Sequence, residues 1–410
     1  MITIHVNTAR EYDVLLADGL LSQAGELIRE DLYRRRGGSG GKEARQICVV
    51  SDQTVSDLFG GREQTLIPAL EEAGFRVTTF VFADGEDHKR METVESLLDH
   101  LTAHHFTRTD LIVALGGGIP GDVAGFAAAI YLRGIDFVQI PTSLLAAVDS
   151  SVGGKTGVNL PAGKNLAGAF HQPNLVLFDP SVLKTLPPDR LQDGMAELLK
   201  AGFIGDPEIL RTAMDLQEPT AADPGTPGQN GAAGSDAESF LVRREALLPL
   251  IARAIDVKRR IVEEDERESG SRKLLNLGHT VGHAIERCSD YRLSHGKAVA
   301  QGMLLVAEAA ARRRLCREGC PKTIRQILTR FGFDLCCPFS PEDLAEAAAS
   351  DKKIRGETIT LVIPDYPGPC RLESLPVSEL EGFIRDGLEG LPVDVSEGLI
   401  RDGVYHSDGD

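Results

Sequence analysis

The chain has 410 residues, more than one ordinary hydrophobic core holds, and this length predicts two domains of roughly 100–200 residues each. Hydrophobic residues make up 42% and charged residues 26%, a composition typical of a globular protein. The net charge of −17 excludes a general binder of nucleic acid or anionic membranes, because phosphate binding needs a basic surface, while a few local cations still suffice for a small anionic substrate.

The N-terminal sequence, the length of the apolar runs and the cysteines indicate the cellular compartment of the protein. The N-terminus has no basic segment followed by an apolar core, and the sequence contains no run of about 18 apolar residues, so we expect neither a signal peptide nor a membrane span. The seven cysteines form no CxxC pair. We therefore expect mainly free thiols in a reducing, cytoplasmic compartment.

In the first half of the chain, short apolar runs alternate with helical patterns. The runs 112–116, 137–141 and 175–179 stop at Gly, Pro or Asp and predict buried strands, while 91–101 predicts a helix. This alternation predicts an α/β domain, with a parallel or mixed sheet covered by helices, which we place at residues 1–187.

From about Pro187 the apolar residues recur at spacings of three and four, which predicts a mainly α-helical second domain over 188–390. One late apolar stretch, 358–364, predicts a strand or hairpin arm. The segments 34–42 and 218–235, rich in Gly and polar residues, predict loop insertions. The acidic residues 391–410 predict a mobile tail.

A glycine cluster follows the predicted strand at 112–116. Gly116, Gly118 and Gly121 satisfy G-x-G-x-x-G, and a helix start after such a turn offers backbone N–H groups to a pyrophosphate. The alternative is a tight turn without a ligand. The acidic residue expected about 20 positions later is not found at a strand end, so this is not a standard dinucleotide fingerprint.

A second glycine segment, 149–159, resembles a phosphate-binding loop but has Asp149 where that motif needs glycine. Lys155 and Lys164 lie in glycine-flanked loops, where a lysine either contacts an anion or is simply solvated. His279 and His283 are four apart on a predicted helix, as in metal-binding helices. With His295 and Glu197 they offer a zinc site with an open position, and spacing alone assigns both helical histidines to the metal.

Several long segments together carry a more specific signal. GGGIPGDVAGF, YLRGIDFVQIPTSLLAAVDSSVGGKTGVNLPAGKNLAGAF, GMAELLK and LLNLGHTVGHAIE occur in this order and resemble the 3-dehydroquinate synthase family of sugar-phosphate cyclases. The resemblance implies an N-terminal domain that binds NAD and a C-terminal helical domain that binds zinc or cobalt. It also implies an active site in the cleft between these domains and a homodimer.

The resemblance also implies roles for individual residues. It assigns the metal to Glu197, His279 and His295, and it makes His283 a proton carrier that faces the substrate. The implied NAD contacts are Asp52, Glu86, Lys89, Gly117, Gly118, Asp122, Thr142, Ser143, Lys164 and Thr185. The implied substrate contacts are Arg133, Asp149, Lys155, Asn165, Lys200, Lys258, Arg272, Asn276 and Lys352 or Lys353.

The implied reaction converts 3-deoxy-D-arabino-heptulosonate 7-phosphate into 3-dehydroquinate and phosphate in the shikimate pathway, with NAD reduced and reoxidised in each turnover. The alternatives are a sibling cyclase that acts on sedoheptulose 7-phosphate or glucose 6-phosphate, a metal-dependent polyol dehydrogenase, and a binding protein that has kept only the fold. Arg272 and Asn276 favour the heptulosonate, because its carboxylate suits the two parallel hydrogen bonds of a guanidinium.

Overall fold

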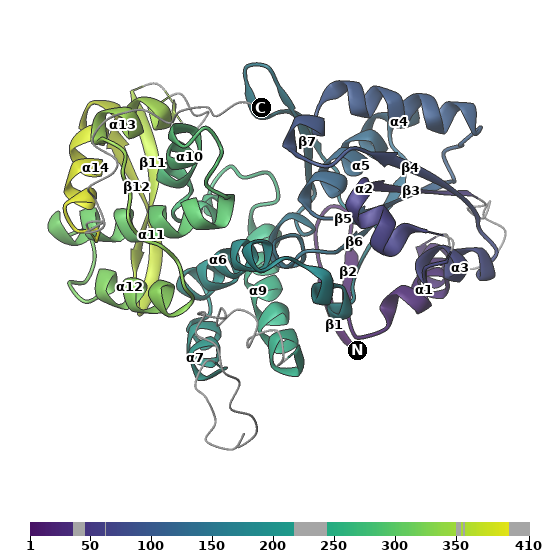
Figure 1. The fold of residues 1–410 in the computed structure, drawn as a ribbon, viewed down its shortest axis with the longest axis horizontal. Coiled ribbons are helices and arrows are strands. Elements are labelled where there is room, and N and C mark those ends of the chain that lie inside the picture. Colours follow the sequence, from purple (N-terminus) through teal and green to yellow (C-terminus); the bar gives the residue numbers. More distant parts are fainter. Residues whose placement is uncertain (36–45, 62, 217–243, 350–353, 356, 393–410) are drawn as a thin grey trace, which may run out of the picture. The chain divides into compact units, whose positions relative to one another are not determined.

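The structure is a computed structural model that describes residues 1–35, 46–61, 63–216, 244–349, 354–355 and 357–392. The chain divides into two compact units, Met1–Leu275 and Asn276–Asp410, each with its own sheet (Figure 1). Among the described residues, no helix has both the length and the apolar character that crossing a membrane requires.

The first unit is built on a seven-stranded sheet with the order β1-β2-β9-β6-β5-β3-β4. Its strands are β1 (Ile2–Val6), β2 (Tyr12–Leu16), β3 (Gln46–Asp52), β4 (Arg76–Phe82), β5 (Leu111–Gly116), β6 (Asp136–Pro141) and β9 (Leu175–Phe178). Only the β1–β2 pairing is antiparallel. Central parallel strands are covered on both faces, which is why β5 is apolar throughout and buried at every position.

Helices cover both faces of this sheet. The helices of this unit include α1 (Leu20–Arg35), α2 (Gln53–Val55), α3 (Leu66–Glu72), α4 (Met91–Ala103), α5 (Gly118–Ile130), α6 (Pro188–Ile204), α7 (Pro207–Leu216) and α9 (Arg244–Glu264). α4 and α5 lie on one face and α1 and α3 on the other (Figure 1). Leu97 of α4 and Val123 of α5 pack in one cluster with Ile112 of β5, so the helical apolar stripes and the strands form a common core.

The structure confirms the sequence-predicted elements of this unit as β5, β6, β9 and α4. It adds the strands β1 to β4 and a separate hairpin, β7 (Lys155–Leu160) and β8 (Gly163–Phe170), which the apolar runs did not indicate.

One predicted loop boundary was wrong. Arg34 and Arg35 still belong to α1, because both form ion pairs with Asp31 one turn earlier, at 2.9 and 2.7 Å. The remainder of the 34–42 segment, all of 218–235 and the tail beyond residue 392 lie outside the described residues.

The second unit combines helices with a small antiparallel sheet. Its elements are α10 (His279–Cys288), α11 (His295–Arg312), α12 (Cys320–Arg330), α13 (Pro341–Ala349), β10 (Ile354–Arg355), β11 (Thr358–Asp365), β12 (Gly368–Pro376) and α14 (Leu380–Leu388). The stretch predicted as a strand or hairpin arm is β11. The units divide at a different place from the predicted boundary after residue 187, because α9 packs on the first unit, and that boundary stays a prediction.

Glycines set the distance between α10 and α11. Gly278 has a φ of +77°, and Gly302 of α11 lies directly against it: a Cβ added at Gly302 would be 2.2 Å from the Gly278 carbonyl oxygen. A Cβ at Gly282 would be 3.1 Å from the Ala298 carbonyl oxygen. The two backbones are therefore in direct contact, which no larger residue at these positions allows.

We predict that Gly302→Ala lowers the free energy of unfolding by about 1–3 kcal/mol, because the added methyl group forces the two helices apart. Urea unfolding of the variant and the parent measures this difference. Gly319→Ala is the matched control: a Cβ there meets nothing within 4 Å. Equal stability of the Gly302 variant and this control would contradict the close contact.

Candidate functional site

The predicted cofactor residues gather where the parallel strands end. Asp52 is the last residue of β3, and the segments after β4, β5, β6 and β9 contain Glu86, Lys89, Gly117, Gly118, Asp122, Thr142, Ser143 and Thr185, while Lys164 lies in β8. β3 has β4 on one side and β5 on the other, so the chain order reverses between β3 and β5. Open α/β sheets form their ligand crevice outside the carboxyl ends of the strands at such a reversal.

The glycine turn joins β5 to α5. Gly117 caps α5, and the backbone N–H groups of a helix start of this kind favour an anion. Gly125 has a different purpose, because its Cβ would be 2.4 Å from Cγ2 of Thr156. The glycine turn therefore leads into the start of α5, and Gly125 within the helix lets α5 pack against β7.

Lys89 connects the predicted cofactor and substrate sets. Its ammonium group is 2.5 Å from the Asp122 carboxylate and donates to Oδ1 of Asn165 at 2.6 Å. Burial raises the pKa of Asp122, and Lys89 opposes that shift by stabilising the charged carboxylate. Nearby, Glu86 accepts a hydrogen bond of 2.7 Å from the Asn159 amide.

Lys258 and Asp149 form a second charged pair. The Lys258 ammonium on α9 donates to the Asp149 carboxylate at 2.6 Å and also to its backbone carbonyl. Burial lowers the pKa of Lys258, while the Asp149 carboxylate opposes that shift. The pair brings a predicted substrate cation of α9 to the turn that precedes Lys155.

The loop after α9 is folded around Asp265. Its carboxylate accepts backbone hydrogen bonds from Gly270 and Arg272, at 2.6 and 3.1 Å. Desolvation opposes the effect, but these and neighbouring hydrogen bonds lower the pKa of Asp265 to about 2. The loop presents Glu268, whose carboxylate is 2.6 Å from the Lys155 ammonium. Sequence reasoning did not select Glu268; its place in the acidic run before Arg272 was the available signal.

Arg272 is the largest fully buried side chain, with 1% of its surface exposed. Its guanidinium donates to the carbonyl oxygens of Gly153, at 2.8 Å, and Glu266. Tyr12 completes this arrangement by accepting a 3.0 Å hydrogen bond from the Gly153 amide. In this conformation Arg272 holds the backbone beside Lys155, and its predicted contact with a substrate carboxylate stays a prediction.

The other predicted substrate residues are more dispersed. Arg133 is exposed in a short 3-10 turn, Tyr131–Arg133, and Lys200 forms a buried ion pair with Glu197 on α6. Asn276 is the first residue of the second unit. Lys352 and Lys353 lie outside the described residues.

Three histidines converge in the second unit. The ring centroids of His279 and His295 are 5.2 Å apart, and those of His283 lie 5.4 and 5.9 Å from them. Nδ1 of His279 is 3.1 Å from the Leu277 carbonyl oxygen and donates to it. That hydrogen bond fixes the tautomer and leaves the lone pair of Nε2 for a metal ion.

Glu286 supports this cluster. Its carboxylate lies 3.1 Å from Nδ1 of His295, an arrangement that orients a metal-binding imidazole and raises its basicity. Ligand atoms of His283, Glu286 and His295 all lie within 4.8 Å of one another, so this unit contains a candidate Glu/His metal site. Sequence reasoning missed Glu286, although it lies three residues after His283 on the same helix face.

Known proteins are similar to this chain over most of its length. Residues 79–193 match the family model described as 3-dehydroquinate synthase N-terminal, and residues 194–354 match 3-dehydroquinate synthase C-terminal. A 3-dehydroquinate synthase from Streptococcus pneumoniae is 39% identical over 375 residues, which cover 91% of this chain and 96% of that protein.

Two solved structures are similar as well. One is a 2-deoxy-scyllo-inosose synthase complexed with carbaglucose-6-phosphate, NAD+ and Co2+, with 26% identity, a TM-score of 0.75, and coverage of 94% of this chain and 100% of that one. The other is a 2-epi-5-epi-valiolone synthase from Streptomyces hygroscopicus subsp. jinggangensis with NAD+ and Zn2+ bound. It has 26% identity, a TM-score of 0.76, and coverage of 94% and 99%.

The fold and these similarities define the class: an enzyme of the sugar-phosphate cyclase superfamily. The sequence identity of 39% over 91% of the chain shows to which family of this superfamily the chain belongs. The chain belongs to the 3-dehydroquinate synthase family, and its activity is that carbon–oxygen lyase step of the shikimate pathway.

We predict that Glu286→Gln weakens zinc binding by about 10–100-fold, because a neutral amide is a poorer acceptor for Nδ1–H of His295. Competition with a chelator measures the affinity, and circular dichroism checks the fold. Glu346→Gln, at an exposed position of α13, is the control and keeps the parent affinity. Equal zinc affinity in both variants would rule out this role for Glu286.

Proposed function

We propose that the chain converts 3-deoxy-D-arabino-heptulosonate 7-phosphate into 3-dehydroquinate and phosphate with one NAD and one zinc or cobalt ion. The observation that carries the proposal is the histidine cluster of α10 and α11, in which two rings already have their Nδ1 atoms engaged. The relatives with bound NAD+ and Zn2+ or Co2+ support the choice of cofactors.

The side chains present fit a metal ion. We assign its ligands to Glu197, His279 and His295, a carboxylate and two imidazoles, the donor set that catalytic zinc takes while keeping a position open. Glu197 supports this assignment as a buried carboxylate on α6, with 3% of its surface exposed. Lys200, one turn later, balances its charge and is proposed to contact the substrate.

The segments after the sheet strands fit NAD. The proposed contacts at the strand ends are Asp52, Glu86, Lys89, Gly117, Gly118, Asp122, Thr142, Ser143 and Thr185, with Lys164 added from β8. The capped start of α5 supports binding of the pyrophosphate, because its backbone N–H groups and positive dipole end favour an anion.

When bound, NAD accepts and returns a hydride, and the metal ion polarises an oxygen of the substrate. Lys155 and Arg133 are proposed to bind the phosphate that leaves, as cations do. Glu268 holds Lys155 at 2.6 Å in the described conformation, so the phosphate has to replace a carboxylate. Arg272 and Lys258 are proposed to bind the substrate carboxylate, with Asp149, Asn165 and Asn276 as further polar contacts.

His283 is the proposed proton carrier, because an imidazole exchanges protons near neutral pH and its ring lies beside the two ligand rings. Lys352 or Lys353 is proposed as an additional substrate contact. The ring closure that ends the reaction needs correct positioning above all, and partly buried pairs such as Lys258 with Asp149 are proposed to supply it.

A homodimer and a cytoplasmic location complete the proposal. All seven cysteines are free thiols, which supports a reducing compartment. The sibling reaction on sedoheptulose 7-phosphate or glucose 6-phosphate is the alternative, and the lower identity of 26% to the two solved cyclases disfavours it.

We predict that the purified protein, supplied with the heptulosonate phosphate, NAD and zinc, releases phosphate without accumulating NADH. The oxidation is reversed within each turnover, so the absorbance of NADH stays flat while phosphate rises. A polyol dehydrogenase would instead produce NADH in step with substrate loss. Turnover of sedoheptulose 7-phosphate at an equal kcat/KM would point to the sibling branch.

We predict that His283→Ala keeps its zinc and loses turnover, whereas His279→Ala loses both. The metal ligands anchor the ion, while a proton carrier acts only on the substrate. Metal analysis after dialysis, alongside kcat, distinguishes the two roles. Loss of zinc in His283→Ala together with its retention in His295→Ala would reverse the ligand assignment.

A further inference from the structure

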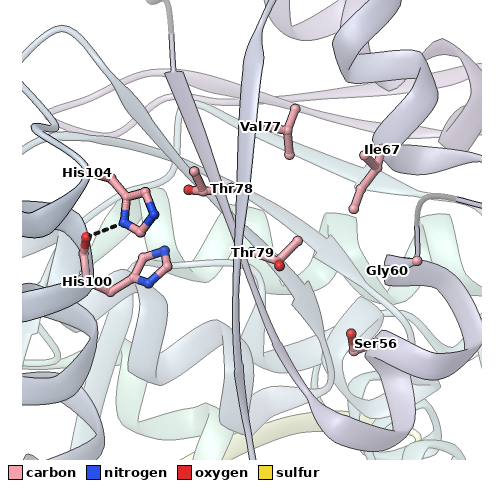
Figure 2. Close-up of a pocket in the computed structure, with 9 residues that line it drawn as sticks. Ser56, Gly60, Ile67, Val77, Thr78, Thr79, His100 and His104 are labelled. Carbon is pink, nitrogen blue, oxygen red and sulfur yellow. Dashed lines mark hydrogen bonds between the residues drawn. The ribbon is translucent and has the colours of Figure 1, made fainter.

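A cavity of about 480 Å³ lies along β4, the edge strand of the first sheet (Figure 2). α4 forms one wall with His100 and His104, and β4 contributes Thr78. Figure 2 shows both imidazoles on the same side of the strand, facing Thr78. None of these residues belongs to the proposed catalytic machinery.

The two histidines are one helical turn apart, and their ring centroids are only 4.2 Å from each other. Nδ1 of His104 is 2.8 Å from the His100 carbonyl oxygen and donates to it. This bond fixes the tautomer of His104 and leaves the Nε2 lone pair available, as carbonyl acceptors do for metal-binding histidines.

The wall also contains a buried polar atom that lacks a hydrogen-bond partner, which a ligand or water would supply. This atom is Nε2 of His100. Such atoms are rare in folded proteins. Burial lowers the pKa of His100, and His104 adds to that shift, which favours the neutral form of the His100 ring that binds metals.

We propose that His100 and His104 form an accessory binding site for a divalent transition-metal cation, of the class of Zn2+, Ni2+ and Cu2+. Paired imidazoles favour these ions over Mg2+ and Ca2+, which prefer oxygen ligands. The cavity leaves room for water molecules of about 30 Å³ each to complete the coordination. Phe80 packs edge-on against His100, with centroids 5.6 Å apart, and limits its rotation.

Calorimetric titration of Zn2+ into enzyme already loaded with one catalytic zinc tests the proposal. The parent protein should bind a further equivalent, and His100→Ala and His104→Gln should each weaken that step by about tenfold or more, because each removes one of two ligands. His105→Asn is the matched control: His105 is the next residue, exposed, with a φ of +57° that Asn tolerates, and it should bind as the parent does.

Phosphate release by the zinc-loaded variants checks their folding and should equal that of the parent, since neither residue contacts substrate. Nickel retention gives an independent measure, because Ni2+ also prefers imidazole. Absence of a second zinc equivalent in the parent, or an equivalent that survives both His100→Ala and His104→Gln unchanged, would overturn the proposal. Neither result would affect the proposed function, because that rests on α10 and α11.

Discussion

The histidine cluster proposed to bind the metal depends on the direct backbone contact between α10 and α11. His279 and His283 lie on one helix and His295 begins the next, so their rings converge only if the helices approach as closely as Gly278 and Gly302 allow. Glycine costs roughly 0.5–1 kcal/mol in a helix relative to alanine. In return, direct contact between the two backbones fixes the position of each imidazole, which a flexible side chain between the helices would not do.

The first unit follows a different constraint, the shared direction of its parallel strands. Strands covered on both faces are mostly apolar, and this is why β5, β6 and β9 could be predicted from sequence. β4 could not, because this edge strand combines buried, partly buried and exposed positions and contains Arg76, Thr78 and Thr79, so it forms no continuous apolar run. The β7–β8 hairpin is polar and partly exposed, so it carries no comparable signal.

The spacing of residues along the sequence predicted the glycine turn and the helix with two histidines. It could not predict contacts between residues that are far apart in the chain. Lys155 meets Glu268 across 113 positions, and Gly153 meets Tyr12 across 141. These contacts form only when β2 and the loop after α9 lie beside the turn that precedes Lys155. The spacing of apolar residues along the sequence does not reveal such contacts. Arg272 is an example: its residue type predicts a carboxylate ligand, and its hydrogen bonds to two backbone carbonyls could not be predicted from spacing.

Two different sets of side chains in the histidine cluster could bind the metal ion, and the two sets exclude each other. If Glu286 bound the metal directly with His283 and His295, its carboxylate would no longer serve solely as the acceptor for Nδ1 of His295. In the assignment with His279 and His295 as ligands, each ring keeps its Nδ1 acceptor, Leu277 or Glu286. The second arrangement satisfies more of the hydrogen bonds already present, and it leaves His283 to transfer protons rather than to hold the ion.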